Sequence, residues 1–301
     1  MNYVIFDLEF NNMREITKYF KNFFIEYPWA TNPLCSNEII EIGAVKLDKY
    51  LKNIDTLKIY IKPQIFPMLN PRITEITGIT EIELENGLSF NDSIDRFREF
   101  VGDDTVICSW AKDDISELII NANYHSYESF EWLKEYVDIQ EYSTKILAEK
   151  KSLSLKNALE RLKIKIDESK LHDALYDAIC TAEVFKRVNN TRIIKNYIVR
   201  DIMNMPSIAI RDFTDFNLDK NMTTLKCPKC NEEVELEYPL KLFSWKFWGL
   251  GFCGNCSSKI LQESIVKVTL KGDNIYSNIS KLLDDVEYAD YTYKYKNTSN
   301  I

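Results

Sequence analysis

Two acidic residues stand at the end of the first apolar segment of the chain. Asp7 and Glu9 fall near the close of the run Tyr3 to Phe10, and residues two apart on a strand point to the same side of a sheet. Carboxylate oxygens are the ligands that Mg²⁺ and Mn²⁺ prefer, and two such ions assist phosphodiester hydrolysis at the attacking water and at the departing oxygen. Taken alone, the pair is better explained as a solvated strand end, so a metal site requires further acids.

A further acid follows the predicted strand Thr105 to Trp110. Asp114 lies at the expected start of the next helix, and the polarity of the strands places this point near the end of the first strand. The alternative is an acid that favours the positive end of the helix dipole, a role that neighbouring Asp113 fills equally well. The residue types alone leave both aspartates open.

The segment around His172 supplies the remaining candidates. The five residues from His172 to Asp177 correspond to about 500° around a helix, so the two side chains would not share a helix face. His172 is therefore predicted to precede the helix, with Asp173 near its cap and Asp177 in its first turns. An imidazole accepts a proton near neutral pH, which suits a general base. The alternative is a cap histidine without a chemical role, and His125, which has no acid pair nearby, stays unassigned.

Cysteines form a second constellation. Two CxxC pairs with 22 residues between them have the spacing of a structural zinc site with four thiolate ligands, Cys227, Cys230, Cys253 and Cys256. A pair of redox dithiols is the alternative, but it lacks a βαβ context. The module resembles a zinc ribbon, which folds reliably only with its metal. The other cysteines are predicted to be core or loop thiols: Cys35, Cys108 and Cys180.

The cysteine module is also rich in aromatic residues. Its core is too small to hide them all, so some should stack on bases or dock on another surface, and packing against the larger domain is the alternative. Lysines 241 and 246 lie among these aromatic residues, which are Phe243, Trp245, Phe247, Trp248 and Phe252.

Strand and helix signals alternate through the first two thirds of the chain, which predicts an α/β fold with a mixed sheet and helices on both faces. The expected strands are Tyr3–Phe10, Ile39–Leu47, Thr56–Ile61, Thr105–Trp110 and Tyr136–Gln140; the expected helices are Ser89–Phe100, Asp113–Asn123, Leu153–Leu162 and Asp173–Arg187. The predicted organisation is a domain at 1–190 with an irregular or helical insertion at 11–37, a connection at 191–220, the four-cysteine ribbon at 221–262 and a tail at 263–301. The tail contains a helix-like stretch, Ile279 to Val286.

Composition narrows the class of protein. The 301 residues carry a net charge of −8, which argues against a protein that coats nucleic acid through clustered lysines and arginines. An acidic catalytic site remains possible, because bound divalent ions reverse its local sign. The sequence shows neither an apolar leader nor a membrane span, so we expect a cytoplasmic protein with reduced cysteines and no membrane partner.

The order of these motifs resembles the DnaQ-like DEDDh exonuclease family over residues 1–190. Within that family the nearest resemblance is to the branch with the RNA-interference and histone-mRNA exonucleases and the KapD-type sporulation proteins. The resemblance rests on Phe6-Asp7-Leu8-Glu9-Phe10, Glu38-Ile-Ile-Glu-Ile-Gly-Ala-Val45, Thr77-Gly-Ile-Thr80, Ser109-Trp-Ala-Lys-Asp-Asp114 and His172 with Asp177.

The resemblance implies a ribonuclease H-like fold with a five-stranded sheet, and release of 5′-mononucleotides from single-stranded 3′ ends, RNA being favoured over DNA. It selects Asp114 over Asp113 and implies two Mg²⁺ or Mn²⁺ ions held by Asp7, Glu9, Asp114 and Asp177, with His172 as general base. It also implies substrate contacts from Leu8, Phe10, Thr77, Gly78, Ile79 and Trp110.

Two departures from the family pattern and two other functions stay open. Ala111 stands where the branch usually has glycine, and the 11–37 insertion is longer than usual, which bears on substrate entry. A DNA exonuclease of the proofreading or repair type is one alternative function. A catalytically quiet adaptor that binds nucleic acid, or a protein partner through the zinc ribbon, is the other.

Overall fold

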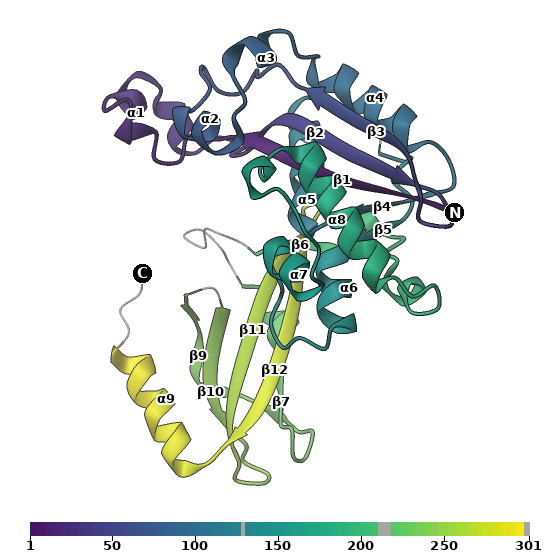
Figure 1. The fold of residues 1–301 in the computed structure, drawn as a ribbon. Helices are drawn as coiled ribbons and strands as arrows, with labels where there is room; N and C mark the ends of the chain where they lie inside the picture. The colour runs from purple at the N-terminus through teal and green to yellow at the C-terminus, as the bar shows by residue number, and fades with distance from the viewer. Residues whose placement is uncertain (128–129, 210–217, 245, 298–301) are drawn as a thin grey trace. The chain divides into compact units, whose positions relative to one another are not determined.

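The computed structural model of the protein describes residues 1–127, 130–209, 218–244 and 246–297. The chain divides into two compact units, Met1–Ile202 and Met203–Ile301. Each unit has its own sheet (Figure 1).

A five-stranded sheet with the order β3-β2-β1-β4-β5 forms the centre of the first unit. The pairs β1–β2 and β2–β3 are antiparallel, whereas β1–β4 and β4–β5 are parallel. The predicted mixed five-stranded sheet is thus confirmed. Its strands are β1 (Asn2–Asn11), β2 (Glu38–Leu47), β3 (Asn53–Tyr60), β4 (Thr105–Ser109) and β5 (Tyr136–Asp138).

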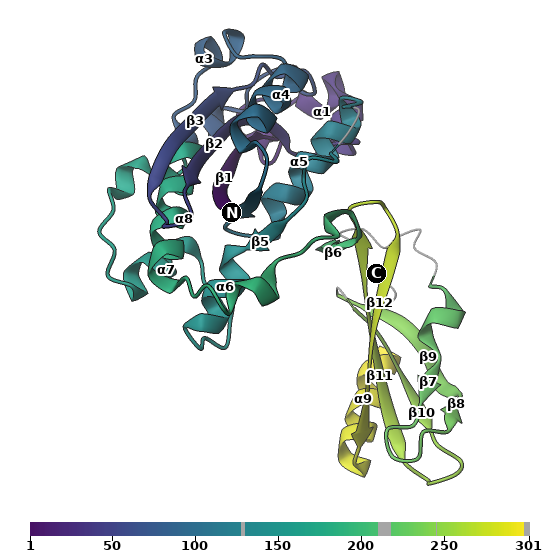
Figure 2. The same cartoon turned by 90° about the vertical axis from the view of Figure 1, so that its right-hand side faces the viewer.

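Helices cover both faces of this sheet (Figures 1 and 2). On β1, Tyr3 and Phe6 point to opposite faces because strand residues alternate. The Tyr3 ring lies 5.0 Å from that of Phe185 in α8 (Ala174–Val188), and the Phe6 ring lies 5.4 Å from that of Phe97 in α4 (Phe90–Val101). Asp7 and Glu9 lie an even number of residues from Tyr3, so their side chains point to the same face of the sheet, towards α8.

The predicted helices are present with small shifts at their ends. The Ser89 side chain caps α4, and Thr80 forms a capping box with Glu83. Three helices of this unit, α2, α3 and α6, were not predicted. Helix α6 follows β5 directly, and the Asp138 side chain caps it by accepting a bond from the backbone N–H of Glu141 at 2.8 Å. The remaining helices of this unit are α1 (Phe23–Glu26), α2 (Pro71–Thr77), α3 (Glu81–Glu85), α5 (Lys112–Tyr124), α6 (Ile139–Ile146) and α7 (Leu155–Arg161).

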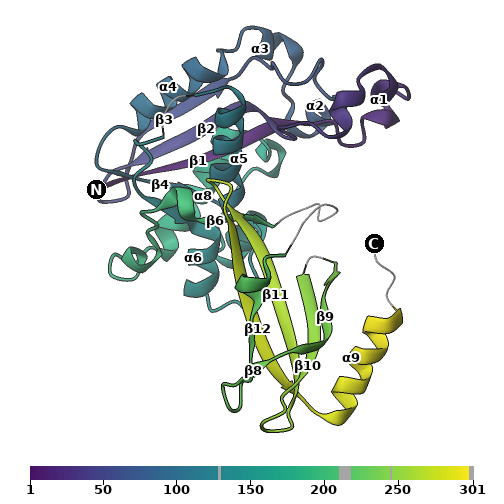
Figure 3. The ribbon, with the colours of Figure 1, turned by 180° about the vertical axis from the view of Figure 1, so that it is seen from behind.

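The 11–37 insertion forms short helical turns beside α2 (Figures 1 and 3). Its buried residues, among them Ile16 and Phe23, pack on Ile65 and Phe66. Asn70, the cap of α2, donates bonds from Nδ2 to the carbonyls of Asn12 and Arg14 at 2.8 and 3.0 Å. The insertion and α2 therefore form one packed element.

The second unit is built on a long antiparallel sheet of order β12-β11-β10-β9, and a smaller hairpin carries the first cysteine pair. A short strand, β6, pairs with β11, and α9 packs on one face of the sheet. The bounds are β6 (Pro206–Ala209), β7 (Leu225–Lys226), β8 (Glu233–Val234), β9 (Leu236–Phe243), β10 (Lys246–Phe252), β11 (Lys259–Thr269), β12 (Asn274–Leu283) and α9 (Asp285–Asn297).

The prediction of a helix at Ile279 to Val286 is wrong. Most of that stretch lies in β12, which pairs with β11 from Val268 to Lys259. The apolar spacing of Ile279, Leu282 and Val286 mimics a helix, but the extended pairing with β11 decides the structure. The predicted boundary at residue 262 falls inside β11, so the strands continue into the segment predicted as a tail.

Two aromatic residues of this unit, Phe243 and Trp248, pack against α9. Phe243 stacks on Trp248 with ring centroids 3.9 Å apart, and both contact Tyr295 of α9. Phe252 stays 47 % exposed, and Trp245 lies outside the described residues. A helix of the same unit therefore covers part of the aromatic surface that the sequence assigned to bases or to another domain.

The described helices include none that is both long and apolar enough to span a membrane.

Candidate active site

Three elements of the first unit bring the predicted acids to one edge of the sheet. Because β1 and β4 are parallel, the end of β1, with Asp7 and Glu9, lies beside the end of β4, where α5 begins and places Asp114 in its first turn. Helix α8 adds Asp177 from its own first turn.

Gly43 on β2 allows α8 to lie against the sheet. A Cβ atom at this position would overlap the backbone of Ala174 and Leu175, the first residues of α8. Any larger residue would therefore push the first turn of α8, and with it Asp177, away from β1.

The side chains of Glu9, His172 and Asp177 converge. Each offers a ligand atom, and these atoms lie within 4.8 Å of one another. Asp7 and Asp114 join them, since the charges of Asp114, Glu9 and Asp177 all act on Asp7. The structure thus brings together the five residues predicted to be catalytic, and their chemical roles stay predictions.

Burial and mutual repulsion raise the pKa values of these acids. Burial, followed by the charges of Asp114 and Glu9, raises the pKa of Asp7 well above its usual range. Burial, followed by the charges of Glu41 and Asp177, raises the pKa of Glu9 to about 9. Burial is also the main cause that raises the pKa of Asp114 and of Asp177. Such a set of carboxylates favours the binding of protons or of cations.

His172 precedes α8, as predicted, and Asp173 is the N-cap of this helix. The backbone of His172 is left-handed, with φ 69°, an unusual conformation for a residue with a side chain. Its N–H donates to Asp177 Oδ2 at 3.1 Å, which ties the turn to the acid. The side chain is exposed above the acids, where it can exchange protons with solvent.

The donor set fits divalent cations. Asp177 Oδ1 is buried and has no hydrogen-bond partner among the described residues, as expected of an oxygen that faces a cation. The acids offer hard oxygen ligands, the kind that Mg²⁺ and Mn²⁺ prefer.

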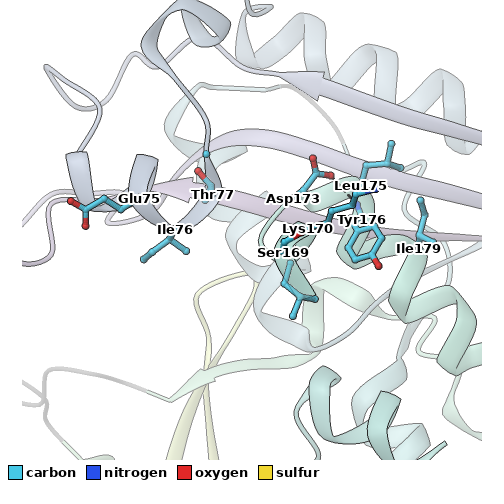
Figure 4. Close-up of a pocket in the computed structure, with 11 residues that line it drawn as sticks. Glu75, Ile76, Thr77, Ser169, Lys170, Asp173, Leu175, Tyr176 and Ile179 are labelled. Atoms are coloured by element: carbon cyan, nitrogen blue, oxygen red, sulfur yellow. Dashed lines mark hydrogen bonds between the residues drawn. The ribbon is translucent and has the colours of Figure 1, made fainter. Parts of the chain in front are cut away.

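A groove of about 530 Å³ lies between α2 and α8 (Figure 4); its lining includes Asp173, the neighbour of His172, but neither His172 nor the four acids. Thr77 and Gly78, at the end of α2, line one wall, and Asp173 and Tyr176, at the start of α8, line the other. Gly78 is the left-handed cap of α2, with φ 75°. The other predicted substrate contacts are not among the lining residues: Phe10 is half-buried, and the core includes Leu8, Ile79 and Trp110.

Sequence reasoning missed two residues at this site. Glu41 lies directly opposite Glu9 in the pairing of β1 with β2, is fully buried, and forms an ion pair with Lys58 of β3. A charged residue inside the apolar run Ile39 to Leu47 was the available signal. No sequence signal indicated the role of Lys58, because only the pairing of β3 with β2 brings it close to Glu41.

The four cysteines of the second unit also converge, with sulfur atoms within 4.8 Å of one another. Both CxxC loops have the same backbone pattern: Asn231 N–H donates to the Cys227 carbonyl and Ser257 N–H to the Cys253 carbonyl, each at 2.8 Å. The four-sulfur cluster fits the predicted zinc ribbon.

A mixed five-stranded sheet flanked by helices, with acids gathered where β1 and β4 end, defines a nuclease of the ribonuclease H-like class. The chain belongs to the Exonuclease family (RNase_T), whose model matches residues 4–185. The predicted DnaQ-like DEDDh family and the enzyme class, an exonuclease, are confirmed by this match.

Relatives agree with this family. The chain is 32 % identical over 151 residues to the PolC-type DNA polymerase III of Thermotoga petrophila, covering 50 % of this chain but only 10 % of that protein. It is 27 % identical over 154 residues to the DNA polymerase III epsilon subunit of Aquifex aeolicus, covering 50 % of this chain and 72 % of that protein. Its fold is similar to the nuclease domain of 3′hExo, a DEDDh family member bound to rAMP, with TM-score 0.51 and 19 % identity over 62 % of this chain and 90 % of that one.

The raised pKa values predict how stability depends on pH. The folded-state pKa of Glu9 is about 9, against an ordinary value of 4.5, and that of Glu41 is raised to about 7. The folded protein therefore holds protons that the unfolded chain releases, so without divalent ions stability should fall as pH rises from 6 to 9. Mg²⁺ should replace the proton on Glu9 and raise the melting temperature more at pH 9 than at pH 6. Thermal unfolding with and without Mg²⁺ measures both effects; equal shifts at the two pH values would contradict the expectation.

Proposed function

We propose that the protein hydrolyses nucleic acid from the 3′ end, releasing 5′-mononucleotides from single strands, with RNA favoured over DNA. The observation that carries this proposal is the convergence of Glu9, His172 and Asp177 beside Asp7 and Asp114. In this proposal the four acids hold two Mg²⁺ or Mn²⁺ ions. These ions, when bound, supply Lewis acidity to the attacking water and to the departing oxygen.

The chain's own residues would perform the other steps. The groove between α2 and α8 receives the terminal nucleotide, and the backbone at Thr77 and Gly78 lets it approach closely. His172 takes the proton from the attacking water and, because it is exposed, releases it to solvent. Because His172 lies in a left-handed turn before α8, its imidazole lies beside Asp177 although the residue is not part of the helix.

A zinc ion held by the cysteines of the second unit is proposed as structural. The four cysteine thiolates would fill the four positions of a tetrahedral zinc ion and would leave none open for substrate. Contact of the ribbon with nucleic acid or with a protein partner is also proposed.

DNA is the competing substrate. The relatives named above are a PolC-type DNA polymerase III and a DNA polymerase III epsilon subunit, which favours DNA. The motifs named above resemble the branch of RNA exonucleases, which favours RNA. Direct contacts to the 2′-hydroxyl would separate the two substrates.

Side-by-side digestion of 5′-labelled RNA and DNA oligonucleotides of one sequence, with Mn²⁺, tests the proposal. We expect ladders that shorten from the 3′ end and a higher kcat/KM on RNA. Faster digestion of DNA would reject the RNA preference and keep the exonuclease. Binding of both strands without any ladder would favour a catalytically quiet adaptor.

A further inference from the structure

Lys58 on the edge strand β3 lies between two carboxylates that have no place in the proposed metal site. Its Nζ is 3.2 Å from Glu41 Oε1 and 2.5 Å from Asp173 Oδ2. Both carboxylates lie close enough to the candidate active site for their charges to act on Glu9. Lys58 joins β2, β3 and the start of α8 through one ammonium group.

Glu41 brings an extra negative charge to the site. It is the cross-strand partner of Glu9, so both side chains point to the same face of the sheet, towards α8. Glu41 is fully buried, and its charge acts directly on Glu9. A buried carboxylate at this place, if left unpaired, would compete with Glu9 for a cation or repel the phosphate of the substrate.

Asp173 connects Lys58 to the turn that carries His172. Its Oδ1 accepts a bond from the Tyr176 N–H at 2.9 Å and thereby caps α8, while its Oδ2 binds Lys58. The adjacent His172 has the left-handed backbone, so the turn needs external support. The ammonium group of Lys58 anchors this turn to the edge of the sheet.

We propose that Lys58 is a positioning residue of the nuclease site: it neutralises Glu41 beneath Glu9 and anchors, through Asp173, the turn that carries His172. The inference rests on the proposed function for its catalytic consequence. Glu41 and Glu9 therefore have different roles: Glu41 pairs with Lys58, and Glu9 stays available for the metal ions.

The test compares Lys58→Met, Lys58→Arg and the double variant Glu41→Gln/Lys58→Met with the wild-type chain. Lys62→Met is the matched control, an exposed lysine four residues further along the chain. Turnover on a labelled oligonucleotide gives kcat, and Mn²⁺ titration by calorimetry without substrate gives the metal Kd. Thermal unfolding is recorded for each variant.

We expect Lys58→Met to lower kcat about tenfold or more, while the Mn²⁺ Kd stays equal or becomes tighter because negative charge is added. Glu41→Gln/Lys58→Met should regain a large part of the lost kcat and melt above Lys58→Met, since the uncompensated buried charge is gone. Lys58→Arg should stay within about threefold of the wild type, because the positive charge is kept. Lys62→Met should match the wild type.

An unchanged kcat in Lys58→Met, or a double variant no better than the single one, would overturn the proposal. Loss of Mn²⁺ binding in proportion to activity would also overturn it, because that result describes general damage to the site. If the wild type degrades no oligonucleotide, the proposed function fails. In that case the melting temperatures of the single and double variants still decide the pairing of Lys58 with Glu41.

Discussion

Replacing Asp7 with asparagine is expected to reduce metal-dependent shortening of a 3′ end by about 10³-fold or more, because Asp7 would help to hold the catalytic cations. Asp7 is surrounded by Asp114, Glu9 and Asp177, so its charge acts at the centre of the site. Asparagine keeps the shape and removes the charge. The rate of nucleotide release under single-turnover conditions measures the loss.

Asp114→Asn and His172→Ala should show losses of similar kind, and Asp113→Asn is the matched control. Asp113 and Asp114 are neighbours in the first turn of α5, but Asp113 is exposed, whereas Asp114 is less exposed and its charge acts on Asp7. We expect full activity in Asp113→Asn. Activity retained in Asp7→Asn, or equal losses in Asp113→Asn and Asp114→Asn, would reject the assignment of the acids.

Loss of the zinc site should have the largest effect on stability. Replacing Cys227 and Cys230 with serine is expected to remove about one zinc ion per chain and folding free energy on the order of 10 kcal/mol from the ribbon. The core around the cluster is small: Leu225, Val234 and Ile260 are its buried residues other than cysteine. Elemental analysis measures the zinc, and hydrogen exchange reports the unfolding of β7 and β8.

Cys35→Ser is the control for this experiment. Cys35 is buried in the first unit, and its thiol donates to the Asn37 carbonyl at 3.3 Å, a bond that serine can make. Its zinc content should equal that of the wild type. A chain without zinc that keeps slow exchange in β7 and β8 would show that the cluster is not a structural metal site.

Local sequence signals predicted the elements that carry the acids. The apolar run before Asp7, the five-residue spacing of His172 and Asp177, and the strand before Asp114 each depend on neighbours in the chain. The structure has these elements where the patterns place them. Such features need no knowledge of the tertiary fold.

Features that depend on pairing between distant segments were missed. The β12 strand is fixed by its pairing with β11, which local apolar spacing could not reveal. Lys58 reaches Glu41 and Asp173 only because β3 pairs with β2 and α8 lies over Gly43. The cover that α9 forms over Trp248 likewise results from tertiary packing.

The most direct test is anomalous scattering from crystals soaked in Mn²⁺ with a 5′-mononucleotide. Two Mn²⁺ peaks, roughly 4 Å apart, are expected among Asp7, Glu9, Asp114 and Asp177, with the imidazole of His172 next to them. Manganese bound elsewhere, or no manganese at these carboxylates, would contradict a two-ion nuclease site.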